Sequence, residues 1–139
     1  MGTRTYRTVL IGAGNVASFL KENVNSPFEV LAVGGRNRDC PIPNDADIYI
    51  ISVSDKAISA VAEELRDVSG LVVHTAGSVP MDVLPQTRRG VLYPLQTITK
   101  GRKLTPLRVP FYIEANQEPD LDLLCSLAEA MGSTAMRMD

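Results

Sequence analysis

Short apolar runs alternate along this chain with segments in which apolar residues recur at helical spacing. The runs are three to six residues long and several are bounded by glycine, proline or aspartate, which is typical of buried strands. They predict strands at residues 6–11, 28–33, 48–51, 71–73, 90–93, 109–113 and 135–138. Because most of these runs are apolar at every position, we expect a mostly parallel sheet that is covered on both faces.

Helical patterns lie between several of the predicted strands. One begins at Val16 and ends near Asn25, and a short one follows Pro80. A longer stripe predicts a helix after Ser54, which is the expected N-cap, and another predicts a helix from Pro119 to Gly132. The stripe residues are Ala57, Ile58, Val61, Ala62 and Leu65 in the first and Leu123, Leu124, Leu127, Ala128 and Met131 in the second. The pattern predicts an α/β three-layer sandwich with a mostly parallel, doubly wound sheet.

The segment TVLIGAGNVASFL places small residues where the first strand gives way to a helix. Gly12, Gly14 and Ala17 fit the spacing G-x-G-x-x-A. In a dinucleotide-binding turn the first glycine permits a tight turn, the second lets a pyrophosphate approach the backbone, and the small third residue lets helix and strand pack closely. The helix N-terminus then offers free N–H groups to the anion, so we expect residues 12–16 (Gly12, Ala13, Gly14, Asn15 and Val16) to contact the cofactor. The alternative is a tight turn without a ligand.

The end of the second strand indicates which nucleotide is preferred. NAD sites place an acidic residue there to bind the ribose hydroxyls, whereas this chain reads VGGRNRD. Arg36, with Asn37 beside it, is suited to a 2′-phosphate, because a guanidinium binds phosphate through two N–H groups. The sequence therefore favours NADP over NAD, although Asp39 leaves NAD open and a solvated basic loop is the plain alternative.

Composition limits the other classes of function. The chain has 139 residues, of which 45% are hydrophobic and 22% charged, and its net charge is −2. No basic excess points to nucleic acid or an anionic membrane, and no apolar run is long enough to cross a bilayer. With only two cysteines and one histidine, the chain offers no Cys/His zinc site, and we expect no metal. A cytoplasmic location with reduced thiols is the expectation.

Several longer motifs resemble a known family. VLIGAGNVASFL, VGGRN, ADIYIISVSDKAISAVAEEL, VVHTAGSVPMDVL and GVLYPLQTITKG occur in an order seen in Rossmann-like proteins described as NADP oxidoreductases. These are similar to pyrroline-5-carboxylate reductase, the deazaflavin-dependent NADP reductases and the 6-phosphogluconate dehydrogenase superfamily. The resemblance implies that residues 1–139 form a Rossmann-type NADP-binding domain. It also implies a hydride transfer involving a small carbonyl, imine or deazaflavin. Relatives carry a further helical domain that completes the substrate cleft and usually forms a homodimer.

The resemblance also assigns residues that follow the other strands. It places Ser52, Val53 and Ser54 beside the riboses of the cofactor, and the loop that starts at His74 near the nicotinamide. Thr75, Ala76 and Gly77 are therefore candidate cofactor contacts. His74 is the candidate catalytic residue, as a proton donor to a substrate carbonyl or imine. A hydrogen-bonded structural histidine is the alternative. Many relatives have His-Pro where this chain has Tyr93-Pro94.

Other functions stay open or are disfavoured. The runner-up is a module that senses a nucleotide without catalysis. A methyltransferase is disfavoured because the first strand, YRTVLIG, contains no acidic residue, and a short-chain dehydrogenase because no Tyr-x-x-x-Lys pair occurs. After the fifth strand, Gln96 and Thr97 are possible substrate contacts. The basic residues Lys100, Arg102 and Lys103 are expected to be solvated.

Overall fold

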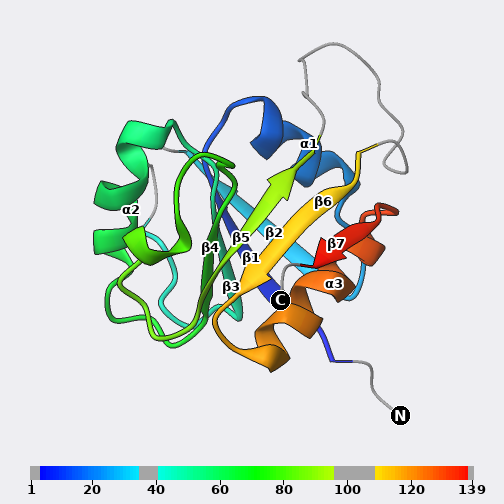
Figure 1. Cartoon of the computed structure of the whole chain (residues 1–139). Helices are drawn as coiled ribbons and strands as arrows, with labels where there is room; N and C mark the ends of the chain where they lie inside the picture. The colour runs from blue at the N-terminus through cyan, green and yellow to red at the C-terminus, as the bar shows by residue number, and fades with distance from the viewer. Residues whose placement is uncertain (1–3, 35–40, 96–108, 138–139) are drawn as a thin grey trace.

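Seven strands form one sheet in the computed structural model, which describes residues 4–34, 41–95 and 109–137. The strands are β1 (Tyr6–Ile11), β2 (Phe28–Val33), β3 (Ile48–Ile51), β4 (Leu71–His74), β5 (Arg89–Pro94), β6 (Phe111–Ala115) and β7 (Ala135–Arg137). Their spatial order is β2-β1-β3-β4-β5-β6-β7 (Figure 1). The first five strands in this spatial order, β2, β1, β3, β4 and β5, pair in parallel. Strand β6 is antiparallel to β5, and β7 is parallel to β6.

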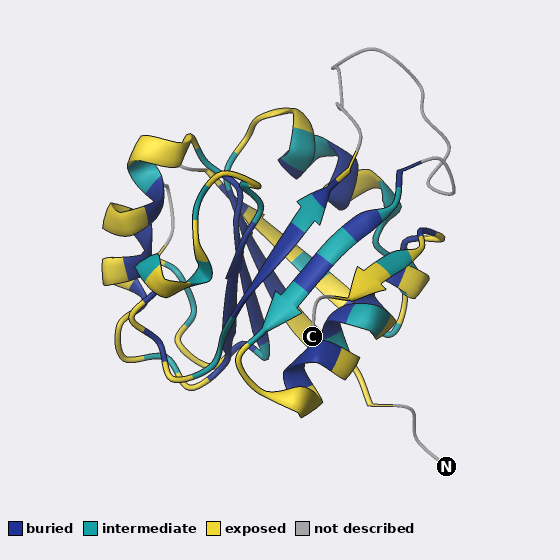
Figure 2. Cartoon of the chain, in the orientation of Figure 1, coloured by how far each residue is buried: buried dark blue, intermediate teal, exposed yellow. Residues whose placement is uncertain are grey.

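Helices cover both faces of the sheet, so the molecule has three layers. The helices are α1 (Asn15–Asn23), α2 (Ile58–Glu64) and α3 (Glu118–Ala130), with 3-10 turns η1 (Asp55–Ala57) and η2 (Met81–Val83). Helices α1 and α3 share one core cluster with inward-facing residues of the sheet, and α2 packs into a second cluster on the other face. Buried residues accordingly concentrate along the central strands (Figure 2). The predicted Rossmann-type α/β fold is confirmed.

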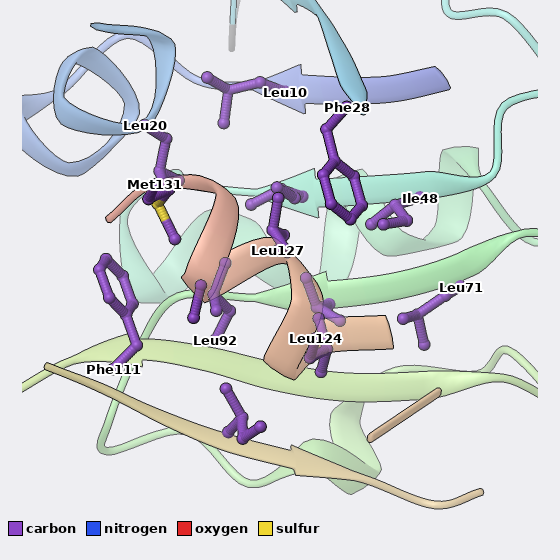
Figure 3. Packing of buried hydrophobic residues seen from close by; sticks show 14 of the residues in the cluster. Leu10, Leu20, Phe28, Ile48, Leu71, Leu92, Phe111, Leu124, Leu127 and Met131 are labelled. Carbon is purple, nitrogen blue, oxygen red and sulfur yellow. The ribbon is translucent and has the colours of Figure 1, made fainter. Parts of the chain in front are cut away.

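The first core cluster fixes α3 and α1 against the same face. Leu124 and Leu127 of α3 are fully buried, and they pack with Leu10, Leu92 and Phe111 of the sheet (Figure 3). Burying side chains of this size contributes about 1.5–3 kcal/mol each relative to exposure. This packing holds α1 and α3 in place. Because α1 is fixed, the turn that joins it to β1 is fixed too.

Local differences from the sequence expectations have simple causes. Strand β6 starts at Phe111 rather than at residue 109, because Val109 is buried ahead of Pro110, and proline has no N–H for the ladder. The segment after Pro80 forms a single 3-10 turn that ends at Val83 and leaves Leu84 outside. Gly132 adopts a φ of 79° after α3, as expected for a residue that follows a helix C-terminus. In the part of the chain that the structure describes, no helix is long and apolar enough to span a membrane.

The sheet order creates the place where a ligand can bind. Strand β1 lies between β2 and β3, so the chain leaves β1 in one direction and later returns on its other side. Such a switch point opens a crevice at the carboxyl ends of the strands. The loops after β1, β3 and β4 all begin at this edge, because the strands are parallel.

Candidate functional site

A cleft of about 860 Å³ lies at the carboxyl edge of the parallel strands. It is lined from the β1–α1 turn, the end of β2, the β3–η1 loop, the loop after β4 and the end of β5. The lining residues are Gly12, Ala13, Gly14, Asn15, Val16, Gly34, Ser52, Val53, Ser54, Asp55, Ala57, Thr75, Ala76, Tyr93, Pro94 and Leu95. The structure thus brings together ten of the predicted cofactor contacts, from three separate stretches of sequence. A cleft of this size matches the range of pockets that hold cofactors.

Gly12 lies where the main chain turns from β1 toward α1, and this position accepts only glycine. Its φ is 137°, and a Cβ built there would lie 1.9 Å from the carbonyl oxygen of Ser52. The backbone is held on both sides: the Gly12 N–H donates to the Val33 carbonyl at 3.0 Å, and the Ser52 N–H donates to the Ile11 carbonyl at 2.8 Å. Gly12 therefore permits the close approach of β1 and β3 at the crevice.

Gly14 has a different environment, although both glycines belong to one motif. It is the N-cap of α1, with φ −83°, and a Cβ built on it would meet nothing within 4 Å. No side chain caps α1, so the first N–H groups of the helix are not bonded by a capping side chain and are available to an anion. Ala17, by contrast, lies on the buried side of α1. The fold itself would tolerate a side chain at position 14, whereas a phosphate that approaches the backbone there needs the space that glycine leaves open.

The β3–η1 loop places hydroxyl groups opposite this helix end. Ser54 was expected to cap the following helix through its side chain, but the structure shows no such hydrogen bond, because the segment begins as the 3-10 turn η1. Ser54 is exposed, whereas Ser52 is buried and accepts a hydrogen bond from Thr75 at 3.2 Å. Asp55 accepts one from Ser78 at 3.0 Å. These bonds tie the β3 and β4 loops together across the cleft.

His74, the candidate catalytic residue, lies at the end of β4 with none of its surface exposed. Its Nδ1 accepts a hydrogen bond from the Ala76 N–H at 3.1 Å, and its Nε2 lies 3.4 Å from the Pro80 carbonyl oxygen. Both ring nitrogens therefore hold the loop that follows β4, and the ring does not line the cleft. This geometry favours the structural alternative. Catalysis by His74 stays an untested prediction.

The stability of the fold should depend on the charge of His74. Burial lowers the pKa of His74 below its ordinary value of 6.5, and a proton on Nδ1 would also oppose the Ala76 donor. Below about pH 6.5 the unfolded chain therefore binds a proton that the folded chain resists, so stability falls as the pH falls. We expect the denaturation midpoint to drop between pH 7.5 and 5.5, and His74→Gln to flatten this slope. This is the chain's single histidine, so an equally steep slope in the variant would contradict the assignment.

The loop after β4 divides the site. Thr75 and Ala76 line the main cleft, whereas Gly77 lines an adjoining cleft. A Cβ on Gly77 would lie 2.5 Å from the Cζ atom of Tyr93, so the glycine lets the end of the tyrosine ring rest on the loop.

Some residues that line the cleft were not predicted from the sequence, and some predicted residues lie outside the described part of the chain. Gly34, Ala57 and Leu95 also line the cleft. Gly34 and Leu95 directly follow strands and Ala57 lies early in a predicted helix, so their position was a signal that could have found them. Arg36 and Asn37, the predicted readers of the nucleotide type, lie outside the described residues. Within the described ranges, no group of His, Cys, Asp and Glu side chains is arranged to hold a metal ion.

Solved structures of known proteins match this fold, whereas the other comparisons found no match. No protein-family model and no curated protein gave a significant match. Among solved structures, the chain is similar to a "putative NADP oxidoreductase" from Bacteroides fragilis, with a TM-score of 0.78 and 27% identity over 97% of this chain. It is also similar to 1-pyrroline-5-carboxylate reductase from Streptococcus pyogenes, with a TM-score of 0.73, 11% identity and 99% of this chain covered. A D-mandelate dehydrogenase solved with NADH gives a TM-score of 0.69, 11% identity and 96% coverage.

These likenesses confirm the Rossmann-type fold and the resemblance to NADP oxidoreductases drawn from the sequence. The matched structures are longer than this chain, which spans 61%, 60% and 57% of their lengths in the same order. The neighbours include proteins named for NADP and for NADH.

Proposed function

Taking the chain as a Rossmann-type domain, we propose that it binds NADPH and forms the cofactor-binding part of an oxidoreductase. The substrate would be a small carbonyl, an imine or a deazaflavin. One observation carries the proposal: an uncapped helix N-terminus faces the cleft across Gly14, where a Cβ would enter open space. Main-chain N–H groups at a helix N-terminus bind a pyrophosphate through hydrogen bonds and the helix dipole.

The sheet order supports one orientation for the cofactor. In this fold the residue that reads the adenosine ribose follows the second strand, and here β2 lies at the edge of the sheet beside β1. The adenosine would therefore lie over Gly34 and the residues after it. The nicotinamide would then extend the other way, past Ser52 and Ser54 toward Thr75, Ala76 and Tyr93, which all line the same cleft.

The roles of the chain's own residues follow from this arrangement. Residues 13–16 would hold the pyrophosphate, and the Ser54 hydroxyl is exposed and free to contact a ribose. The hydrogen bond between Thr75 and Ser52 holds the loops on either side of the nicotinamide end. The cofactor itself would supply the hydride, while the protein orients it and excludes competing reactions.

The preference for NADPH is tested at Arg36. We expect Arg36→Ala to weaken NADPH binding by about 10-fold or more while changing NADH binding little, because a charge-assisted bond to phosphate is worth about 1.5–3 kcal/mol. Cofactor fluorescence on titration gives both affinities. Arg66→Ala is the matched control, since Arg66 is exposed after α2 and pairs with Glu63. Equal losses for NADPH and NADH would exclude a role in reading the 2′-phosphate.

Direct titration tests the proposal as a whole. Saturable NADPH binding by the purified chain, with an increase in nicotinamide fluorescence, is the expected result. A chain that binds neither NADPH nor NADH at millimolar concentration contradicts it. The alternative of a sensor without catalysis is separated by turnover: the longest natural form of the protein should oxidise NADPH with an acceptor, whereas a sensor would bind the cofactor and leave it unchanged.

A further inference from the structure

A second cleft, of about 510 Å³, adjoins the nicotinamide end of the main cleft. The two share Ala76, Tyr93 and Leu95 in their walls. The second cleft extends from there over the sheet face formed by β5 and β6, under the loop of residues 76–80. It therefore lies where a molecule that exchanges hydride with the nicotinamide would have to sit.

The antiparallel pairing of β5 with β6 builds the floor of this cleft. Val91 lies opposite Glu114, and Tyr93 opposite Tyr112, so these four side chains share one face of the sheet. Strand β6 alternates along its first four residues between buried and half-buried (Figure 2). The buried residues, Phe111 and Ile113, belong to the core cluster under α3. Tyr112 and Glu114 therefore face away from α3 and into the cleft.

The described residues give this cleft a negative charge. Glu114 accepts a hydrogen bond from the Tyr112 hydroxyl at 3.0 Å on Oε1, which leaves Oε2 for another partner. Burial, reinforced by this bond and the carboxylate charge, raises the pKa of Tyr112, so the phenol remains a donor. Among the described residues that line the cleft, Glu114 is the sole acidic side chain and none is basic.

The arginines on nearby strands are held elsewhere. Arg137 of β7 pairs with Glu118 and Asp122 of α3, on the opposite side of the sheet. Arg89 of β5 donates to the Gln86 carbonyl at 2.9 Å and lies 3.8 Å from Asp82. Neither neutralises Glu114.

Tyr93 forms the partition between the two clefts. Its ring is half-buried, and its Cζ end rests over Gly77. Within the described part of the chain, no hydrogen bond of the Tyr93 hydroxyl is found. With respect to the described residues, this hydroxyl can therefore act as a donor and an acceptor at the wall shared by both clefts.

We propose that the second cleft is the substrate chamber and that it selects an amine or iminium cation, through the Glu114 carboxylate and the Tyr93 hydroxyl, over a carboxylate. The proposal rests on the proposed function for the place of the nicotinamide, but the charge preference belongs to the cleft itself. An anionic substrate would meet an unpaired carboxylate oxygen in a partly desolvated space, and like charges in such a space repel. A cation would gain a charge-assisted hydrogen bond from Glu114.

The test uses two probes of matched size and opposite charge, cyclopentylammonium and cyclopentanecarboxylate. Each is titrated against the ¹⁵N-labelled chain, with and without saturating NADPH, and amide shifts in residues 76–79 and 111–115 are followed. We expect the cation to shift these amides saturably and the carboxylate not to do so. Glu114→Gln should weaken the cation by about fivefold or more, as expected for loss of a partly buried charge partner of about 1 kcal/mol. Glu129→Gln is the matched control, because Glu129 is exposed on α3, whose buried side packs against the opposite face.

The outcomes separate this proposal from the proposed function. Carboxylate binding equal to that of the cation, or a cation affinity unchanged in Glu114→Gln, would overturn the chamber even if NADPH binds normally. Selective cation binding in the apo chain would support the chamber even if NADPH failed to bind. Tyr93→Phe keeps the ring over Gly77 and removes the hydroxyl, so it should weaken binding of the cation. An unchanged cation affinity in this variant would remove the Tyr93 hydroxyl from the proposal.

Discussion

Substitution of Gly14 by valine is expected to abolish NADPH binding and to leave the fold intact. A Cβ at this position meets no atom of the chain within 4 Å, and φ is −83°, which any residue can adopt. The valine side chain would instead fill the space in front of the α1 N-terminus. Losing the bonds from these N–H groups to a pyrophosphate should raise the dissociation constant by about 100-fold or more, or about 2.7 kcal/mol.

The measurement combines cofactor fluorescence with a thermal or urea unfolding curve. Valine is a poorer N-cap than glycine, so a loss of about 1 kcal/mol in stability is expected and is small beside the stability of a typical domain. Gly14→Ala serves as the graded control, because its single methyl group should reduce affinity less than valine does. A valine variant that binds NADPH like the parent would remove the main support for the proposed function.

Substitution of Gly12 by alanine is expected to damage the fold itself. The new methyl group would lie 1.9 Å from the Ser52 carbonyl oxygen, a backbone atom that cannot rotate away. Moving it would disturb the Ser52 N–H bond to Ile11, and with it the pairing of β1 and β3. The φ of 137° adds strain for any residue with a Cβ. Together these effects should cost more than about 3 kcal/mol.

Equilibrium unfolding in urea measures this loss, and circular dichroism shows whether Gly12→Ala folds at all. The comparison with Gly14→Ala is sharp because the two variants add the same methyl group two positions apart. One should lose stability and the other affinity. A Gly12→Ala protein as stable as the parent would mean that the β1–α1 turn differs from the one described here.

Much of the fold could be predicted from the order of residues, because burial leaves a local mark. The apolar runs of β1, β2 and β3 have the bounds that the hydrophobic pattern predicts. In β3 every residue is buried, and a strand covered on both faces is apolar at every position. The glycine spacing after β1 likewise located the cleft, because the motif lies within one βα unit. The ends of β6 and of the 3-10 turn after Pro80 were less predictable, since they depend on which partner strand or loop the segment meets.

Gly12, His74 and Glu114 show most clearly what the sequence determined and what the tertiary structure decided. The sequence by itself determined the α/β class, the β1–α1 turn and the placement of Gly12 and Gly14 in it. Only the tertiary structure shows why Gly12 cannot carry a Cβ, because the neighbour that excludes it is Ser52, which follows β3 and is far away along the chain. It alone turned His74 toward the backbone at Ala76 and Pro80. It alone set Glu114 on the same face as Tyr93, because strand pairing joins residues that are far apart along the chain.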